Sequence, residues 1–105
     1  MTMKNNQNIP ENLKSFETII NEMLSTYEKK NHDYGNSFDD TCDKFGLIAA
    51  AVRMNDKMSR INSLISGKTA KVTDEKLEDT LKDLANYCIM TLMYIKKAKK
   101  DGKNK

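Results

Sequence analysis

The sequence of 105 residues has no tryptophan, one proline and four glycines. Strands of an all-β protein are joined by turns that proline and glycine usually supply, so their scarcity argues against an all-β fold. There are only two cysteines, Cys42 and Cys88. They lie far apart, without the close spacing of a cysteine-rich metal site, and we expect two reduced thiols in a cytoplasmic protein.

Long apolar runs and a large charge of one sign are also missing. No stretch reaches the roughly 18 apolar residues of a membrane-spanning helix, and no secretory signal is visible, so no membrane partner is expected. The net charge is only +3, and much of the basic excess lies in the last ten residues. A lysine-rich end is usually solvated, so we do not expect nucleic acid as a partner.

What the sequence does contain is the periodicity of amphipathic helices. After a polar segment at 1–10, which we expect to be flexible, an apolar stripe predicts a helix over 11–31. Turn-forming residues end this helix, and a capping-box-like Ser37–Asp40 predicts a second start at Ser37. A long helix then runs to about Ser66, with an interruption near Gly46, and its expected core face is Leu47, Met54, Met58, Ile61 and Ile65.

Gly67 ends that helix, and Thr73 is the predicted N-cap of a last helix that runs to about Lys99. The expected core face of this helix is Leu77, Leu81, Leu84, Cys88, Leu92 and Ile95. Between Leu84 and Ile95 the helix is apolar on nearly every side, so it must be buried on more than one side. Either a partner subunit or the N-terminal segment of the same chain would cover the additional face.

These patterns predict an all-α fold, a small helical bundle of about three long helices. The expected organisation is a single helical domain over 11–99 and a basic flexible tail over 100–105. A chain of this length buries a modest core, and we expect a homo-oligomer, a dimer or larger.

Acidic and amide side chains gather on the last helix. Asp79 and Asp83 are one turn apart, and Asn86 follows at the next turn. Two such carboxylates suit Mg²⁺, which needs only one or two of them when phosphate oxygens complete its shell. Asp83 lies beside the apolar run, where a charge must be paired. Glu75 and Glu78 fit a solvated acidic face as well as a site.

Cationic side chains form a second group, on the preceding helix. Arg53, Lys57 and Arg60 share one face with Asp56, and an arginine fork suits phosphate or carboxylate. Asp56 either orients these cations or adds a third metal ligand. The alternative is an interhelical salt-bridge network in which Arg53 and Arg60 pair with Asp79 and Asp83.

A third group surrounds the first turn region. Tyr34 is suited to stacking on a base and Asn36 to bonding with the edge of that base. Lys30 and Asp33 stand close by in sequence and complete the predicted nucleotide contacts.

Three segments in order resemble the nucleotide modification associated domain, first type: Lys30–Gly35, Arg53–Arg60, and Asp74–Tyr87 with its Asp-Leu-Ala-Asn-Tyr run. The resemblance covers about residues 25–95. That family is found mainly in bacteria and their phages, so it implies a nucleotide-linked role in a bacterial cell or phage-infected host.

A more distant resemblance is to the all-α nucleoside triphosphate pyrophosphatases, the group of MazG and the dimeric dUTPases. They bind Mg²⁺ through Glu-x-x-Glu on one helix and Glu-x-x-Asp on a later one, and cleave between the α- and β-phosphates. Asp83 matches the final Asp. Thr80 stands where a Glu is expected, and Arg53 and Asp56 stand where two glutamates are expected, so the metal-ligand set departs from that pattern.

The leading hypothesis is a nucleotide-binding protein of deoxynucleotide metabolism or of DNA-nucleotide modification, with Mg²⁺-dependent pyrophosphatase activity as its enzymatic form. One alternative is a non-catalytic phage protein that sequesters a nucleotide against host defence. Another is a structural helical module that serves only oligomerisation, its charged faces holding the bundle together.

Overall fold

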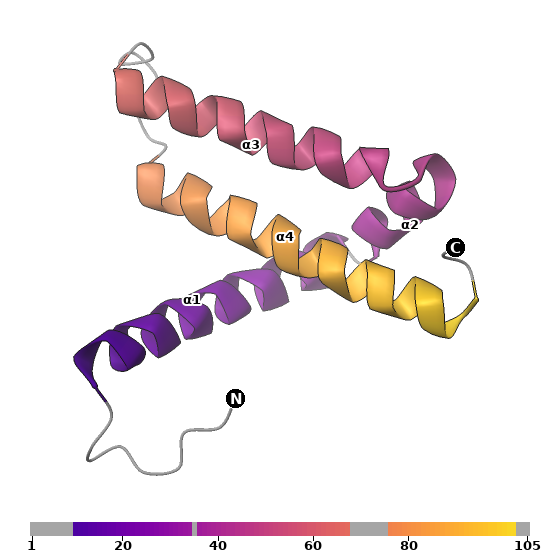
Figure 1. Cartoon of the computed structure of the whole chain (residues 1–105), viewed down its shortest axis with the longest axis horizontal. Coiled ribbons are helices and arrows are strands. Elements are labelled where there is room, and N and C mark those ends of the chain that lie inside the picture. Colours follow the sequence, from indigo (N-terminus) through magenta and orange to yellow (C-terminus); the bar gives the residue numbers. More distant parts are fainter. Residues whose placement is uncertain (1–9, 35, 68–75, 103–105) are drawn as a thin grey trace. The chain divides into compact units, whose positions relative to one another are not determined.

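The computed structural model describes residues 10–34, 36–67 and 76–102, and it confirms the all-α prediction, since these residues contain helices and no strand. The helices are α1 (Glu11–Tyr34), α2 (Ser37–Phe45), α3 (Ile48–Ser66) and α4 (Leu77–Lys100) (Figure 1). The chain forms two compact units. Residues 1–35 contain α1, and residues 36–105 contain α2, α3 and α4.

Helix α1 begins directly after the single proline, as the sequence predicts. The backbone N–H groups of Leu13 and Lys14 both donate to the carbonyl oxygen of Pro10, at 3.0 and 3.2 Å. The helix ends at Tyr34 instead of residue 31, because the polar residues before Gly35 continue the helix. Intrinsic preference for a turn is weak at any one position, and it is overridden here.

The break between α2 and α3 lies at Gly46, as predicted. Gly46 has φ 81° and ψ −175°, a conformation open to glycine, and its N–H donates to the Cys42 carbonyl oxygen. Helix α2 does start at Ser37, but the residue at the N-cap position is Asn36, without a side-chain capping hydrogen bond. The predicted capping box is therefore wrong, although the helix start that it indicated is right.

Helix α3 ends at a glycine, as predicted, whereas helix α4 begins later than predicted. Gly67 closes α3 in the left-handed conformation, with φ 77°, and its N–H donates to the Ser63 carbonyl oxygen. Helix α4 starts at Leu77 with extended Lys76 at its N-cap position, later than expected. The predicted N-cap Thr73 lies outside the described residues, as does Glu75.

Helices α3 and α4 run antiparallel, side by side, and this pair forms most of the second unit (Figure 1). The residues buried between neighbours are mainly small: Ala50 and Ile61 on α3, Thr80 and Ala98 on α4. They recur at spacings that combine steps of three and four, as expected for helices that pack at a shallow angle.

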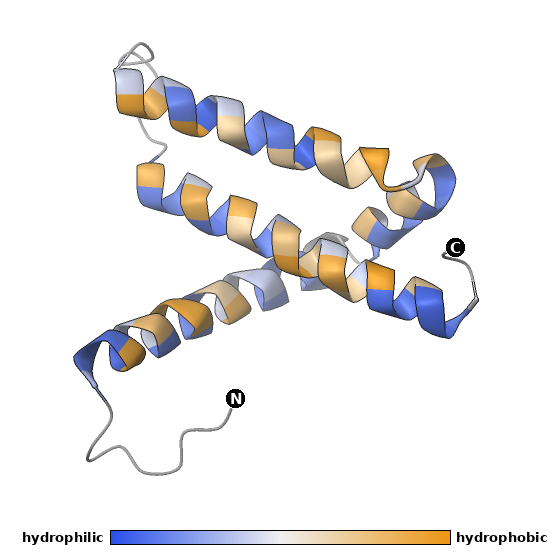
Figure 2. Ribbon diagram, viewed as in Figure 1, coloured by the Kyte–Doolittle hydropathy of each residue, from blue (hydrophilic) through white to orange (hydrophobic). Residues whose placement is uncertain are grey.

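The predicted core faces of α3 and α4 are wrong in part. Leu47, Met58 and Ile65 on α3 are 42%, 44% and 69% exposed, and Leu81 and Leu92 on α4 are 47% and 59% exposed. Hydropathy colouring shows hydrophobic residues recurring along both helices outside their mutual contact (Figure 2). Ile61 of the predicted α3 face is buried as expected, whereas the other buried residues of the two helices, Ala50, Thr80 and Ala98, lie on the adjacent stripes.

Helix α2 completes the core of the second unit. Phe38, Cys42 and Ala50 form a buried cluster, and Tyr87, Met90 and Tyr94 of α4 are among the partly buried side chains packed on it. The rings of Phe38 and Tyr87 lie 5.9 Å apart between centroids, with their planes tilted by 37°. This distance is within the range of favourable aromatic pairs, so the cluster joins α2 to α4 as well as to α3.

Candidate functional site

The centre of the candidate site is an ion pair between α3 and α4. The Lys57 ammonium lies 3.1 Å from a carboxylate oxygen of Asp83, and the two side chains are 24% and 20% exposed. A half-buried charge is costly unless it is paired, so each group accounts for the other's position. The sequence predicted that Asp83 must be paired. The ion pair seen for it is with Lys57, whereas Arg53 or Arg60 was the expected partner in the salt-bridge alternative.

This pair aligns the two polar stripes that the sequence singled out. Arg53 and Arg60 lie one turn to either side of Lys57 on α3. Asp79 and Asn86 lie one turn to either side of Asp83 on α4. Because the helices are antiparallel and Lys57 meets Asp83, Arg53 lies toward the Asn86 end and Arg60 toward the Asp79 end. The predicted cationic and acidic groups therefore share one side of the α3–α4 pair, which we call the polar side.

Arg53 is the unusual member of the polar side. It is half-buried, yet among the described residues its guanidinium forms no ion pair and no hydrogen bond. Its charge lies near the Cys42 thiol. Burial raises the pKa of this thiol, Asp39 raises it further, and the positive charge of Arg53 partly offsets that rise. An arginine held close to the core with its fork of donors unused is suited to a planar or tetrahedral anion from outside the protein.

The other predicted residues on the polar side are more open to solvent. Asp56, Arg60 and Asp79 are exposed, whereas Asn86 is half-buried like Asp83. Within the described part of the chain, no three His, Cys, Asp or Glu side chains come together as a metal-ion site. Mg²⁺ on Asp79 and Asp83 would thus draw its remaining ligands from phosphate and water, and the predicted ligand role of Asp56 stays a prediction.

Thr80 is buried, unlike its neighbours Asp79 and Asp83 on the polar side. Its side chain is fully buried, and its hydroxyl donates to the Lys76 carbonyl oxygen at 3.3 Å. At this position the distant pyrophosphatase pattern carries a glutamate. In this chain the position faces the packed interior of the helix pair, so it offers no carboxylate to a metal.

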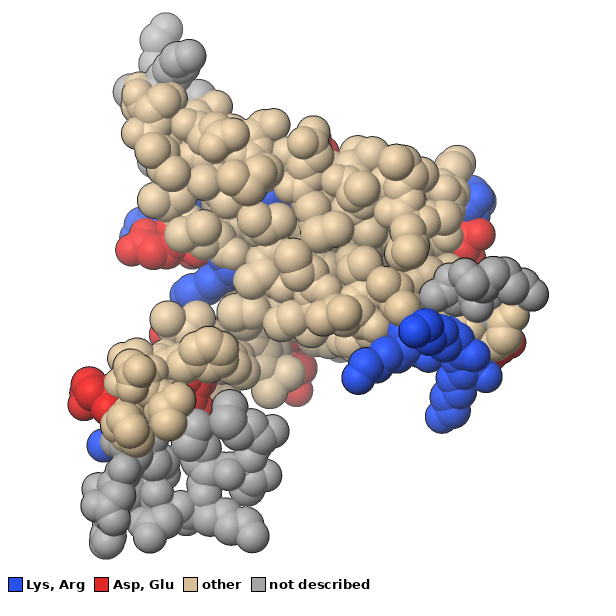
Figure 3. Space-filling model, in the orientation of Figure 1, with Lys and Arg blue, Asp and Glu red and all other residues tan. Residues whose placement is uncertain are grey.

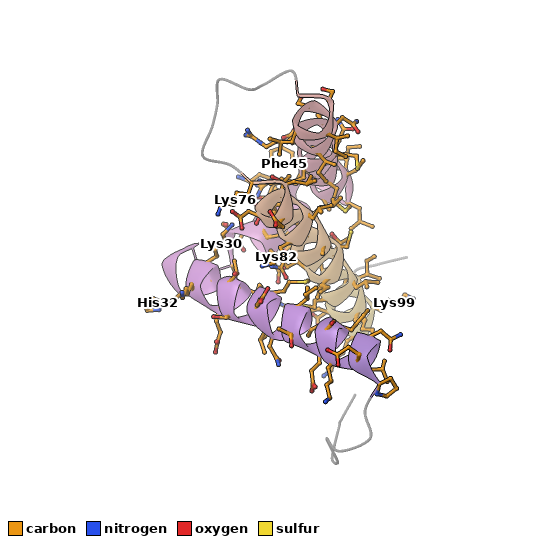
Figure 4. The ribbon with its side chains drawn as sticks, turned by 90° about the vertical axis from the view of Figure 1, so that its left-hand side faces the viewer. Lys30, His32, Phe45, Lys76, Lys82 and Lys99 are labelled. Atoms are coloured by element: carbon orange, nitrogen blue, oxygen red, sulfur yellow. The ribbon has the colours of Figure 1, made fainter. Side chains whose placement is uncertain are left out.

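Four predicted nucleotide contacts belong to other elements than α3 and α4. Lys30 is an exposed residue near the end of α1 (Figure 4), in the unit of residues 1–35. The side chains of Asp33 and Tyr34 lie outside the described set, and Asn36 is exposed at the start of α2. The proposed role of these four residues in holding a base stays a prediction.

Two polar contacts between α2 and α4 were missed by sequence reasoning. The Tyr94 hydroxyl donates to Asp43 at 2.7 Å, and Lys97 lies 3.5 Å from Asp39. The hydrogen bond to Asp43 raises the pKa of Tyr94 to about 12. The only sequence signal was the spacing of Asp39 and Asp43, one turn apart on a short helix. Such a spacing does not predict which residues of α4, more than fifty positions later, these acids contact. These contacts hold α2 in place and lie apart from the Lys57–Asp83 pair.

Residues 30–95 match a family model described as Nucleotide modification associated domain 1, and this range is more than half of the chain. The chain belongs to this family. Every residue of the polar side lies within the part that defines the Nucleotide modification associated domain 1 family. No match was found among curated proteins, and none among solved structures.

Membership agrees with the family resemblance that the three sequence segments indicated. It links the chain by name to nucleotide modification. None of the helices in the described ranges is both long and apolar enough to cross a membrane.

Proposed function

We propose that the protein binds a nucleotide through its phosphates on the polar side of the α3–α4 pair. The observation that supports this most is Arg53, a half-buried guanidinium that pairs with no carboxylate in the described structure. Burying an unpaired charge costs free energy, and such costs are retained where a ligand supplies the missing partner. Family membership supports a nucleotide as the ligand, since the family is named for an association with nucleotide modification.

The chemistry of the neighbouring residues fits a phosphate chain. Arg53 would bond two phosphate oxygens at once, and Lys57, one turn away, would add a point charge. Asn86 lies toward the Arg53 end of the polar side, where its amide offers both donors and an acceptor to a sugar or base. Arg60 would extend the cationic stripe to a further phosphate.

The polar side carries carboxylates as well as cations, which favours a metal-bound nucleotide over a bare anion. Asp79 and Asp83 would hold Mg²⁺ by two oxygens, and phosphate oxygens and water would complete the shell. Bound there, Mg²⁺ would neutralise phosphate charge. Lys57, which pairs with Asp83, would place a second positive charge beside this site.

Binding without hydrolysis is the form of this function that the residues favour. The pyrophosphatase pattern needs several glutamates around the metal. The buried position of Thr80 supplies none, and Arg53 and Asp56 replace two on the earlier helix. A protein that holds a nucleotide and does not cleave it would act by sequestering it or by presenting it to another enzyme.

A thermal-shift and calorimetric screen tests the proposal. The purified chain is titrated with nucleoside mono-, di- and triphosphates, ribo and deoxy, with Mg²⁺ and with chelator. We expect at least one nucleotide to bind and raise the melting temperature, and release of pyrophosphate would identify an enzyme instead of a binder. Arg53→Gln should weaken binding by roughly 10- to 100-fold, the equivalent of about 1.5–3 kcal/mol for hydrogen bonds to a charged group.

Lys97→Gln is the matched control. Lys97 is a cationic residue of α4 that forms an ion pair with Asp39 of α2, away from the polar side. Its loss should leave nucleotide affinity unchanged. The proposal is wrong if no nucleotide binds, or if Arg53→Gln and Lys97→Gln bind equally well.

A further inference from the structure

Helices α3 and α4 each carry two adjacent apolar seams, and only one of the two lies in their mutual contact. The second seam of α4 repeats in steps of four and three residues: Leu81, Ala85, Cys88, Leu92 and Ile95. On α3 the exposed apolar residues of the second seam are Leu47, Ala51, Met58 and Ile65, at steps of four and seven residues. Alternating steps of four and three are the repeat with which helices pack along their length.

The two second seams lie on the same side of the helix pair. Each follows the contact seam by one residue, a rotation of about 100°. In an antiparallel pair, equal rotations of this kind bring both seams to one side. The Cys88 sulfur supports the arrangement, because it lies 3.7 Å from the sulfur of Met54, a half-buried residue of α3 next to its second seam. Figure 3 shows this side of α3 and α4 with hardly any charged side chain.

Several large hydrophobic side chains on this apolar side are open to solvent. Ile65 is 69% exposed and Leu92 is 59% exposed, and exposed apolar residues recur along both helices. A large contiguous apolar patch marks an interaction surface. Helix α4 is apolar on a third side too, since Ile89 and Met93 are 44% and 49% exposed. One additional helix from the same chain would leave one of these two sides of α4 open.

We propose that the apolar side binds the same side of a second copy of this chain, giving a symmetric four-helix bundle of two α3–α4 pairs. The two-fold axis passes beside Cys88, near the middle of the α4 seam, at the level where Met54 of α3 lies against Cys88. Each α4 then lies antiparallel to the α4 of the second copy, and each α3 to its α3. All neighbouring helices in such a bundle are antiparallel, the usual arrangement of this architecture.

Charge along α4 favours a second copy over another partner. The first turn of α4 contains Glu78 and Asp79, and its last turn contains Lys97, Lys99 and Lys100. In an antiparallel pair, the acidic start of one helix lies beside the basic end of the other. Figure 4 shows Lys99 at the end of α4 away from Lys76 and Lys82. With the axis at Cys88, Glu78 of one copy comes level with Lys99 of the other, and their attraction sets the register.

The first test is the mass of the full chain by analytical ultracentrifugation. We expect a dimer for the unaltered protein. Leu92→Glu places a charge in the seam and should shift the mass to the monomer. Val52→Glu is the matched control: Val52 is 54% exposed on α3 but points away from both seams, so this variant should stay dimeric. Helical content by circular dichroism shows whether each variant is folded.

The second test uses the native cysteines. Cys88 is exposed at the proposed axis, and Cys42 is buried. A short bis-maleimide should link two copies through Cys88, the link should persist in Cys42→Ser, and it should disappear in Cys88→Ser. Crosslinking does not depend on whether a variant folds, because the unaltered chain carries the reporter.

Three results would overturn the inference. One is a monomer in solution at concentrations where a stable dimer would form. Another is a dimer that dissociates to the same extent in Leu92→Glu and in Val52→Glu. The third is a dimer in which Cys88 gives no covalent link, which would place the interface on another side of the molecule.

Discussion

Two regions of the α3–α4 pair are held together by different physical means. Around α2, the buried Phe38, Cys42 and Ala50 pack with aromatic side chains of α4, and polar groups at the margin are paired. Around Lys57 and Asp83, the helices meet through half-buried charges, and Arg53, one turn away, pairs with no carboxylate of the described residues. Apolar packing gives more free energy of folding than half-exposed ion pairs do. The first region therefore stabilises the unit, and the second is where a ligand could be accommodated.

The largest effect is expected from the apolar region. Phe38→Ala removes a side chain that is only 7% exposed and that contacts Tyr87, and it should lower the free energy of unfolding by about 3–5 kcal/mol. Urea denaturation followed by circular dichroism measures this. Phe45→Ala is the matched control on the same helix, because Phe45 is 63% exposed. Equal losses for the two variants would contradict the assignment of the core to the Phe38 end of α2.

A smaller effect is expected from the charged region. Asp83→Ala leaves Lys57 half-buried without its carboxylate, and stability should fall by about 1–2 kcal/mol. Asp79→Ala, one turn earlier and exposed, should change stability by about 0.5 kcal/mol or less. The comparison of the two regions would fail if Asp83→Ala destabilised the protein as much as Phe38→Ala.

The sequence predicted the helices well and their contacts less well. Periodicity and the glycines at 46 and 67 located the helices and their breaks. Those signals are local, so the bounds of a helix can be predicted without knowing which helix it packs against. Which stripe of α4 meets α3 is a different question, and the sequence answered it wrongly for Leu81 and Leu92. The buried residues of α4 are the small Thr80 and Ala98, which hydrophobicity alone does not single out.

The candidate site shows the same division. Pairing of Asp83 followed from its place beside an apolar run, a local argument, and it is confirmed. The partner is Lys57 because of the register between antiparallel helices, and spacing within one helix does not contain that register. The sequence also left open whether Arg53 pairs with α4 or binds an anion; among the described residues its guanidinium has no carboxylate partner.

At high pH the hydrogen bond between Tyr94 and Asp43, at the edge of the apolar region, should be lost and stability should fall. The hydrogen bond to Asp43 raises the pKa of Tyr94 from 10.0 to about 12. The neutral phenol is thus favoured by folding, and this contribution is complete below pH 10 and is lost as the pH rises through 12. Stability of the unaltered protein should fall more steeply between pH 10 and 12 than that of Tyr94→Phe. Parallel curves in denaturant titrations across this range would show that the bond does not stabilise the fold.

The smallest effect is expected at the other contact between α2 and α4. Lys97 lies 3.5 Å from Asp39, but its side chain is 60% exposed, so water and salt screen the attraction. Lys97→Gln should change the free energy of unfolding by about 0.5 kcal/mol or less, and added salt should remove even that difference. Asp39→Asn, which removes the same pair from the other side, should give the same small value. A loss as large as that of Asp83→Ala would mean that both regions depend on charge, and the contrast between an apolar and an electrostatic contact would then no longer hold.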